Sequence, residues 1–230
     1  MLISVIRTLL SGGHVSFLDI LAQVVSVLFV IFCILPLHEL AHAWVASKLG
    51  DPTAKYEGRL TLNPLASVDP MGAMMLLLVG FGWARPVPVN PNYFKKPKRD
   101  MALTALAGPL SYLLASFVGA VLYVTVILFM PSGTVARFLS VMLNYYVVVN
   151  VSLAVFNFIP IPPLDGSRIL GAFLSDRMLA KYYGYQNMLS MLLMILLLTG
   201  ALSGPLATAQ NFFLNLIVQA ALFPFKLFLG

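Results

Sequence analysis

The stretch Leu37-His38-Glu39-Leu40-Ala41-His42 decides the fold, because it places three ionisable side chains inside an apolar run from residue 17 to about residue 46. A helix turns by about 100° per residue, so His38 and His42 fall on one face, one turn apart, and both imidazoles can reach one ion. Glu39 points about 100° away from that pair. It can therefore act on a water held by the metal without being a ligand itself.

The H-E-x-x-H pattern also occurs by chance in soluble helices, so its surroundings have to support the metal site. Two histidines and a carboxylate in a lipid-embedded helix are costly unless they are paired, bound to a metal or turned toward a polar cavity. Residues 24–35, which precede the pattern, are almost entirely apolar. We therefore predict that His38 and His42 bind one zinc ion and that Glu39 is the catalytic acid and base.

The composition predicts an integral membrane protein. The 230 residues are 60% apolar and only 10% charged, with a mean hydropathy of +0.93, which is far too apolar for a soluble domain of this size. A single cysteine, Cys33, excludes a disulfide framework and a cysteine-based zinc site within the chain. The positive residues that give the net charge of +6 gather in loops, which indicates membrane topology rather than nucleic-acid binding.

The apolar runs predict an all-α polytopic protein with about five transmembrane helices. The first, residues 17–48, is longer than one bilayer and should bend at Pro36, just before His38. The other four are expected at 101–130, 135–158, 186–199 and 207–228. Residues 1–230 then form a single membrane-embedded domain, with a catalytic core at about 17–175 and accessory helices at about 186–228.

Two segments near the predicted site do not fit a full span. Residues 51–64 alternate in polarity, which predicts a short extended segment that could hold a substrate by main-chain hydrogen bonds, with a plain surface loop as the alternative. Residues 71–83 are apolar but shorter than the roughly 20 residues of a span. If they re-enter, 12 of the 14 Lys and Arg residues lie on one side, with Arg7 and Arg137 opposite. The positive-inside rule favours this re-entrant hairpin.

The stretch Asn157-Phe158-Ile159-Pro160-Ile161-Pro162-Pro163-Leu164-Asp165-Gly166 supplies the third candidate ligand. Its prolines end the preceding helix within the membrane zone, and Asp165 follows in an apolar setting. Zinc bound by two histidines requires a third protein ligand and one open position, and Asp165 is the best candidate for that ligand. The alternative is that Asp165 caps a helix beginning at Gly166. The amide of Asn157 could bond a neighbouring helix or bind substrate.

Together, the HELAH sequence on a membrane helix, Ala107-Gly108-Pro109 early in a later span and the run from Asn157 to Gly166 resemble the site-2 protease family of zinc intramembrane metalloproteases, peptidase family M50. The resemblance covers residues 17 to about 174. Residues 59–64 and 83–90 further resemble a compact prokaryotic branch without a PDZ domain. By this resemblance the zinc ligands are His38, His42 and Asp165, Glu39 is the catalytic acid and base, and Asn157 is a substrate or oxyanion contact.

The resemblance implies an endopeptidase with one Zn²⁺ per chain that cleaves membrane proteins within or near their transmembrane segments. Its expected partners are a substrate with a transmembrane helix and the lipid bilayer, with no nucleic acid. The expected location of the protein is the cell membrane, with the active site nearer the cytoplasmic side. Two alternatives stay open: a membrane metal-ion transporter, which would place ligands along a pathway, and a catalytically inactive membrane scaffold.

Overall fold

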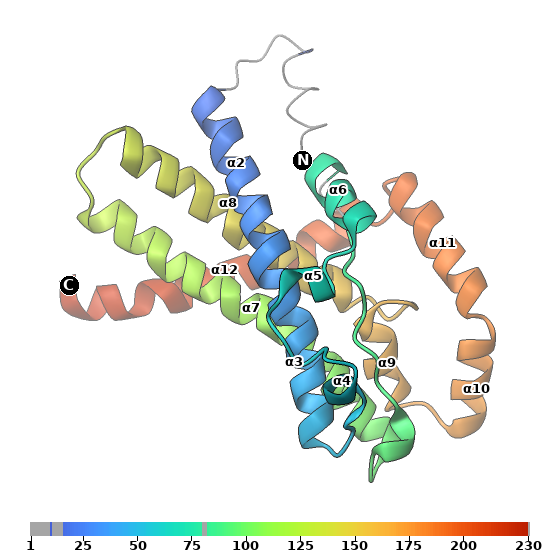
Figure 1. Cartoon of the computed structure of the whole chain (residues 1–230). Helices are drawn as coiled ribbons and strands as arrows, with labels where there is room; N and C mark the ends of the chain where they lie inside the picture. The colour runs from blue at the N-terminus through green and yellow to red at the C-terminus, as the bar shows by residue number, and fades with distance from the viewer. Residues whose placement is uncertain (1–9, 11–15, 80–81, 230) are drawn as a thin grey trace.

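The structure is a computed structural model that describes residues 10, 16–79 and 82–229, and the regular elements of these residues are all helices (Figure 1). The protein is therefore an all-α multi-pass membrane protein, as the composition predicts. Among the described residues, four helical segments are long and apolar enough to cross a membrane: Phe17–Lys48, Pro97–Phe129, Thr134–Asn157 and Ser203–Leu227.

The first span is one continuous helical segment made of α2 (Phe17–Phe29), a π-helical turn η1 (Val30–Ile34) and α3 (Leu35–Lys48). Pro36 lacks an N–H group, and its ring crowds the carbonyl four residues before it. Directly before this proline, the N–H of Leu35 donates to the carbonyl of Val30, five residues back. The helix thus accommodates Pro36 through a π-helical turn that ends four residues before His38.

Short helices occupy the segment that was predicted to be extended. Gly50 ends the first span with a φ of +110°, a left-handed conformation that glycine adopts without strain. The carboxylate of Asp51 then accepts the N–H of Thr53 at 3.0 Å, where α4 (Thr53–Tyr56) begins. Asn63 caps α5 (Pro64–Ser67) in the same manner. The prediction of an extended segment at residues 51–64 is therefore wrong, because side-chain oxygens start helical turns there.

Helix α6 (Pro70–Val79) lies in a segment whose two ends pair with each other. Val68 and Ala84 form an antiparallel β-bridge, and the N–H of Arg85 donates to the carbonyl of Ser67 at 2.8 Å. Because the two ends of the segment lie side by side, it does not cross from one end of the molecule to the other. This geometry agrees with the predicted re-entrant hairpin.

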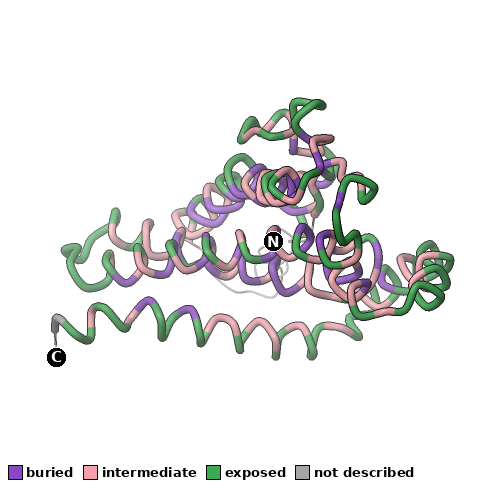
Figure 2. Tube along the Cα trace, turned by 90° about the horizontal axis from the view of Figure 1, so that it is seen from below, coloured by how far each residue is buried: buried purple, intermediate pink, exposed green. Residues whose placement is uncertain are grey.

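The central scaffold is the antiparallel pair α7 (Pro97–Phe129) and α8 (Thr134–Asn157), packed against the first span. One buried apolar cluster joins these helices. Gly119 belongs to a stripe of small residues on α7 that predicts a close helix contact, and it lies against the ring of Tyr146 on α8. Helix α12 (Ser203–Leu229) packs along the α7–α8 pair as a separate outer layer (Figure 2).

After α8 the chain forms α9 (Asp165–Gly171), α10 (Asp176–Gly184) and α11 (Gln186–Leu198). The prediction that residues 186–199 cross the membrane is wrong, although these residues do form a helix. Helix α11 has 13 residues, and at about 1.5 Å per residue it is only about 20 Å long. The hydrocarbon core of a bilayer is about 30 Å thick, so α11 is too short to cross it.

Helix α12 runs from the site end of α8 toward the opposite end of α7. Phe213 stacks on Phe158 with 6.1 Å between ring centroids, and Phe225 lies 6.2 Å from Phe129. Lys226 therefore lies near the turn between α7 and α8, not with the other positive residues as the predicted charge distribution assumed. Arg137 pairs with Asp19 at that end, whereas Arg7 lies outside the described residues.

Candidate metal centre and active site

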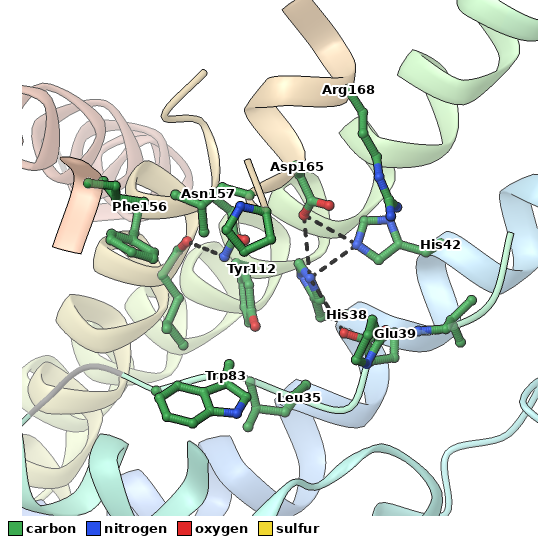
Figure 3. Close-up of a pocket in the computed structure, with 18 of the residues that line it drawn as sticks. Leu35, His38, Glu39, His42, Trp83, Tyr112, Phe156, Asn157, Asp165 and Arg168 are labelled. Carbon is green, nitrogen blue, oxygen red and sulfur yellow. Dashed lines mark hydrogen bonds and ion pairs between the residues drawn. The ribbon is translucent and has the colours of Figure 1, made fainter. Parts of the chain in front are cut away.

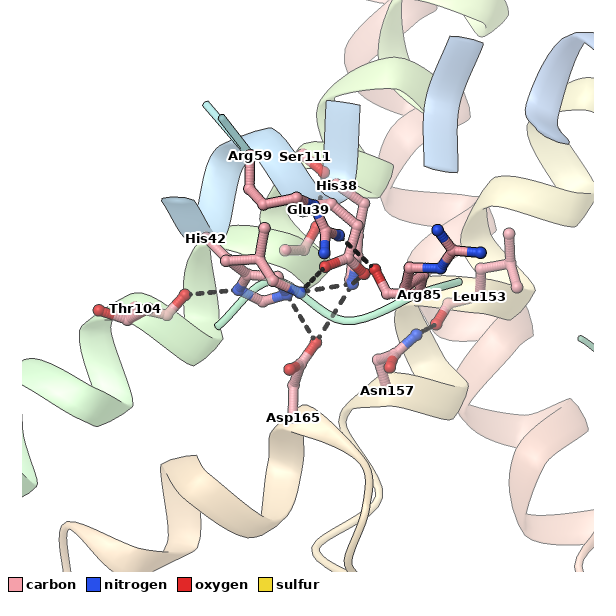
Figure 4. Close-up of polar contacts among 12 residues, drawn as sticks. His38, Glu39, His42, Arg59, Arg85, Thr104, Ser111, Leu153, Asn157 and Asp165 are labelled. Carbon is pink, nitrogen blue, oxygen red and sulfur yellow. Dashed lines mark hydrogen bonds and ion pairs between the residues drawn. The ribbon is translucent and has the colours of Figure 1, made fainter. Parts of the chain in front are cut away.

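Three potential ligand atoms from two helices converge at one point (Figure 4). The Nε2 atoms of His38 and His42, both on α3, are 3.1 Å apart. The Oδ2 atom of Asp165, at the start of α9, lies 3.5 Å from the first nitrogen and 3.3 Å from the second. All three residues are buried. The structure thus brings together the three side chains that the sequence nominates as ligands.

These separations fit a tetrahedral zinc ion. With zinc to ligand distances of about 2.0–2.1 Å, neighbouring ligand atoms of a tetrahedron lie about 3.3–3.4 Å apart. Imidazole nitrogen and carboxylate oxygen are ligand types that zinc prefers, and three protein ligands are the usual number in a catalytic zinc site, which keeps one position open. The residues present therefore fit one such ion.

Helix α7 fixes the orientation of both imidazoles. Nδ1 of His42 lies 2.8 Å from the carbonyl oxygen of Thr104. A carbonyl only accepts hydrogen bonds, so Nδ1 carries the proton and Nε2 is left for the metal. The ring of His38 stacks on Tyr112, with 4.4 Å between centroids and 23° between planes.

Gly108 makes this close approach of α7 possible. A Cβ atom at this position would collide with the imidazole of His42 and with Cε1 of His38. The sequence predicts a kink at Gly108-Pro109, and α7 remains helical through Pro109. The glycine therefore has a specific role here, which is to leave room for the two histidines.

Asp165 faces the two histidines and does not cap the helix that it begins. Helix α9 begins at Asp165 itself, its N-cap residue is Leu164, and no side chain caps it. Gly166 lets α9 approach the end of α8, because a Cβ there would collide with the carbonyl of Phe158. Burial alone would raise the pKa of the Asp165 carboxyl, but the neighbouring histidines, His42 more than His38, hold that pKa below its usual value.

Glu39 lies beside the three ligand atoms and is anchored by a backbone amide. Its Oε2 atom accepts the N–H of Val87 at 2.8 Å, and its Oε1 atom lies 4.0 Å from Nε2 of His38. Val87 belongs to residues 85–90, which we call the strap. One carboxylate oxygen is therefore held by the strap, while the other lies close to the ligand atoms.

The strap is fixed to the protein at two further points. Oδ2 of Asp51 accepts the N–H of Asn90 at 2.7 Å, and Nη2 of Arg59 donates to the carbonyl of Arg85 at 2.7 Å. Sequence reasoning missed both of these supporting residues, since it placed Asp51 and Arg59 in a short extended segment. The signal that was available is the position of Asp51, a carboxylate that directly follows the glycine ending the helix of His38 and His42.

A cavity of about 480 Å³ opens on the candidate metal centre (Figure 3). Asn157 lines it, and the Nδ2 atom of this residue donates to the carbonyl of Leu153 at 2.8 Å, within α8. Asn150, on the same helix, is buried and donates to the carbonyl of Tyr146 instead. Of these two amides, only Asn157 lines the cavity. No residue of the segment 51–64, which was predicted to hold a substrate, is among the described residues that line the cavity.

Helix α11 completes the cavity, which it lines with side chains that include Leu193 and Met194. The hydroxyl of Tyr182 donates to the carbonyl of Pro160, and Oγ of Ser190 lies 2.8 Å from the carbonyl of Pro162. These bonds connect α10 and α11 to the proline-rich turn that leads into Asp165.

Comparison with known proteins agrees with this geometry. A family model described as peptidase family M50 matches residues 124–200, which include Asn157 and Asp165. The chain is 46% identical over 140 residues to "Putative zinc metalloprotease YwhC" of Bacillus subtilis, an alignment that covers 58% of this chain and 62% of YwhC. The chain is thus similar to peptidase family M50 over residues 124–200.

A second relative is zinc metalloprotease MJ0392 of Methanocaldococcus jannaschii, to which the chain is 31% identical over 192 residues. That alignment covers 77% of this chain and 44% of the relative. The chain thus spans less than two thirds of the length of either relative. No solved structure matches it.

Proposed function

We propose that this chain is a zinc-dependent endopeptidase of peptidase family M50 that cleaves peptide bonds within or near the transmembrane segments of other membrane proteins. One observation carries the proposal. His38, His42 and Asp165 form a buried ligand set beside Glu39, and this set opens on a cavity among helices apolar enough to cross a membrane.

The roles of the residues follow from their positions. His38, His42 and Asp165 would hold a zinc ion, which when bound polarises a carbonyl group and makes a water more acidic. The Oε1 atom of Glu39 accepts the proton of the attacking water, while Oε2 stays bonded to the strap. Glu39 then delivers this proton to the amine of the leaving peptide.

Asn157 contacts the substrate. One N–H of its amide is committed to the carbonyl of Leu153, which leaves a second N–H for a substrate carbonyl. A donor that meets the oxygen on which negative charge develops stabilises the transition state. The chemistry of the amide and its place in the cavity support this role.

The substrate is a membrane-spanning helix that unwinds locally, because an intact helix keeps its amides in internal hydrogen bonds. Apolar cavity walls, such as Leu35 and Leu193, suit such a segment. The site lies at the end of the protein that carries most of the Lys and Arg residues. By the positive-inside rule this end faces the cytoplasm, so the chain lies in the cell membrane with its site near the cytoplasmic face.

The decisive test compares the parent protein with Glu39→Gln on a panel of single-span membrane proteins in detergent. We expect about one zinc per chain in both proteins, and cleavage within the span by the parent alone. Glu57→Gln is the matched control because Glu57 is the only other glutamate and is exposed. Full cleavage by Glu39→Gln, or the absence of zinc from both proteins, would refute the proposal.

A further inference from the structure

Arg168 brings a permanent positive charge to the wall of the cavity. It follows Asp165 by three residues on α9, so the two side chains leave the same side of that helix. Arg168 lines the cavity together with His38 and His42 (Figure 3). Among the described residues that line the cavity, it is the only Lys or Arg.

Among the described residues, the guanidinium of Arg168 has neither a hydrogen-bond partner nor an ion-pair partner. Within residues 16–79 and 82–229, the structure gives it no hydrogen bond and no carboxylate within 4.0 Å. Its electrostatic influence on Asp165 is smaller than that of either histidine. Two other cations at this end of the protein do have such partners, since Arg59 donates to the carbonyl of Arg85 and Lys98 pairs with Asp176.

An unpaired guanidinium in an apolar cavity strongly favours an anion. It has five N–H donors arranged in a planar fork, which matches the two oxygens of a carboxylate. The negative charges of Glu39 and Asp165 equal the charge of one divalent ion, so Arg168 would leave the loaded site with an excess positive charge. The other residues that line the cavity, which include Leu153, Phe156 and Leu197, are largely apolar. They do little to screen the positive charge of Arg168.

We infer that Arg168 binds a carboxylate of the substrate and so gives the site a preference for an acidic group close to the scissile bond. This inference rests on the proposed function and adds a substrate class to it. The carboxylate can come from two sources. One is the side chain of an Asp or Glu next to the cleaved bond, and the other is the C-terminal carboxylate of a chain that ends near that bond.

The test uses single-span peptides of Leu and Ala in detergent micelles. Each position on either side of the cleaved bond carries Asp in one peptide and Asn, its uncharged counterpart, in another. A second series ends near the cleaved bond with a free carboxylate or with an amide. We expect the parent to favour the carboxylate in one of the two series by about 10- to 100-fold in kcat/KM, because hydrogen bonds to charged groups contribute about 1.5–3 kcal/mol.

Arg168→Met should reduce this ratio to about 1, and Arg168→Glu should instead favour Lys at the same position. Arg177→Met is the matched control, because Arg177 is exposed on α10 and is not among the residues that line the cavity. It should keep the preference of the parent. The inference is overturned if the parent shows no preference in either series, or if Arg168→Met keeps it.

Two further measurements separate this inference from its alternatives. Zinc per chain is determined for each variant, since loss of zinc from both Arg168→Met and Arg168→Lys would make Arg168 a support of Asp165 and overturn the inference. Affinity for the Asp and Asn peptides is measured by fluorescence anisotropy, which needs no cleavage. If the parent cuts nothing, the proposed function fails, and this binding preference still supports or refutes the role of Arg168.

Discussion

The two walls of the cavity are built in different ways. On the wall formed by α3, α7 and α9, polar atoms meet specific partners at short distances, as with Nδ1 of His42 on the Thr104 carbonyl and Glu39 on the Val87 amide. On the α11 wall the contact is mainly apolar, through side chains such as Leu193, with Ser190 as a polar link.

This difference separates chemistry from access. Directional hydrogen bonds hold the predicted ligand atoms and Glu39 in precise positions. Substitutions on the wall formed by α3, α7 and α9 should therefore alter zinc content or kcat. Apolar side chains can shift against one another without losing a specific bond. Substitutions on the α11 wall should therefore alter KM. The substitutions that follow test this division, beginning with the largest expected effect.

Asp165→Ala removes one of three predicted ligands from the first wall. We expect zinc affinity to fall by more than the roughly 10- to 100-fold that the loss of an outer-shell contact costs. Titration with a competing chelator measures this affinity. Asp176→Ala is the control, since the exposed pair of Asp176 with Lys98 contributes about 0–1 kcal/mol at most and lies outside the cavity. Unchanged zinc affinity in Asp165→Ala would remove Asp165 from the ligand set.

Gly108→Ala tests whether the histidines depend on the close approach of α7. The added methyl group meets both imidazoles, so we expect a loss of stability of about 1–3 kcal/mol and weaker zinc binding. Gly119→Ala is the matched control on the same helix. It crowds Tyr146 instead, so it should lower the unfolding temperature in detergent while zinc affinity stays constant. Equal zinc affinity in both variants would contradict the role of Gly108.

Asp51→Asn tests the strap. Asp51 accepts the N–H groups of Thr53 and Asn90 with separate oxygens, and an amide can replace only one of them. Since the strap holds Glu39 through Val87, we expect kcat to fall about tenfold with zinc content unchanged. Asp69→Asn is the control, because Oδ1 of Asp69 accepts the N–H of Gly72 and an amide oxygen can do the same. A normal kcat in Asp51→Asn would mean that Glu39 does not depend on the strap.

The sequence predicted the parts of the protein that depend on local spacing. The i and i+4 histidines, the proline-rich turn before Asp165 and the long apolar spans are all set by neighbouring residues, and the structure brings His38, His42 and Asp165 to one point. The re-entrant segment at 71–83 followed from its length and from the charge distribution, and its two ends do lie side by side.

The features that the sequence did not predict depend on contacts between distant segments. The Val87 amide reaches Glu39 across 48 residues of sequence, and the Asn90 amide reaches Asp51 across 39. Contacts between segments so far apart leave no periodic pattern in the sequence. At residues 51–64, alternation in polarity was taken for an extended segment because the side-chain hydrogen bonds of Asp51 and Asn63 to backbone N–H groups two residues later were not considered. Capping is local and could have been recognised.

Ser190→Ala is the mildest change and tests the α11 wall directly. Oγ of Ser190 lies 2.8 Å from the carbonyl of Pro162 and equally close to that of Gln186 in its own helix. Losing the bond to the proline-rich turn costs about 0.5–1.5 kcal/mol, so α11 should be held less firmly against the cavity. We expect KM to rise about 2- to 10-fold, while kcat and zinc content stay constant. Ser152→Ala, which removes only a bond within α8, should change neither constant. A fall in kcat for Ser190→Ala would show that this wall also positions the reacting groups, because Pro162 lies three residues before Asp165 and a shift of that turn would reach the ligand.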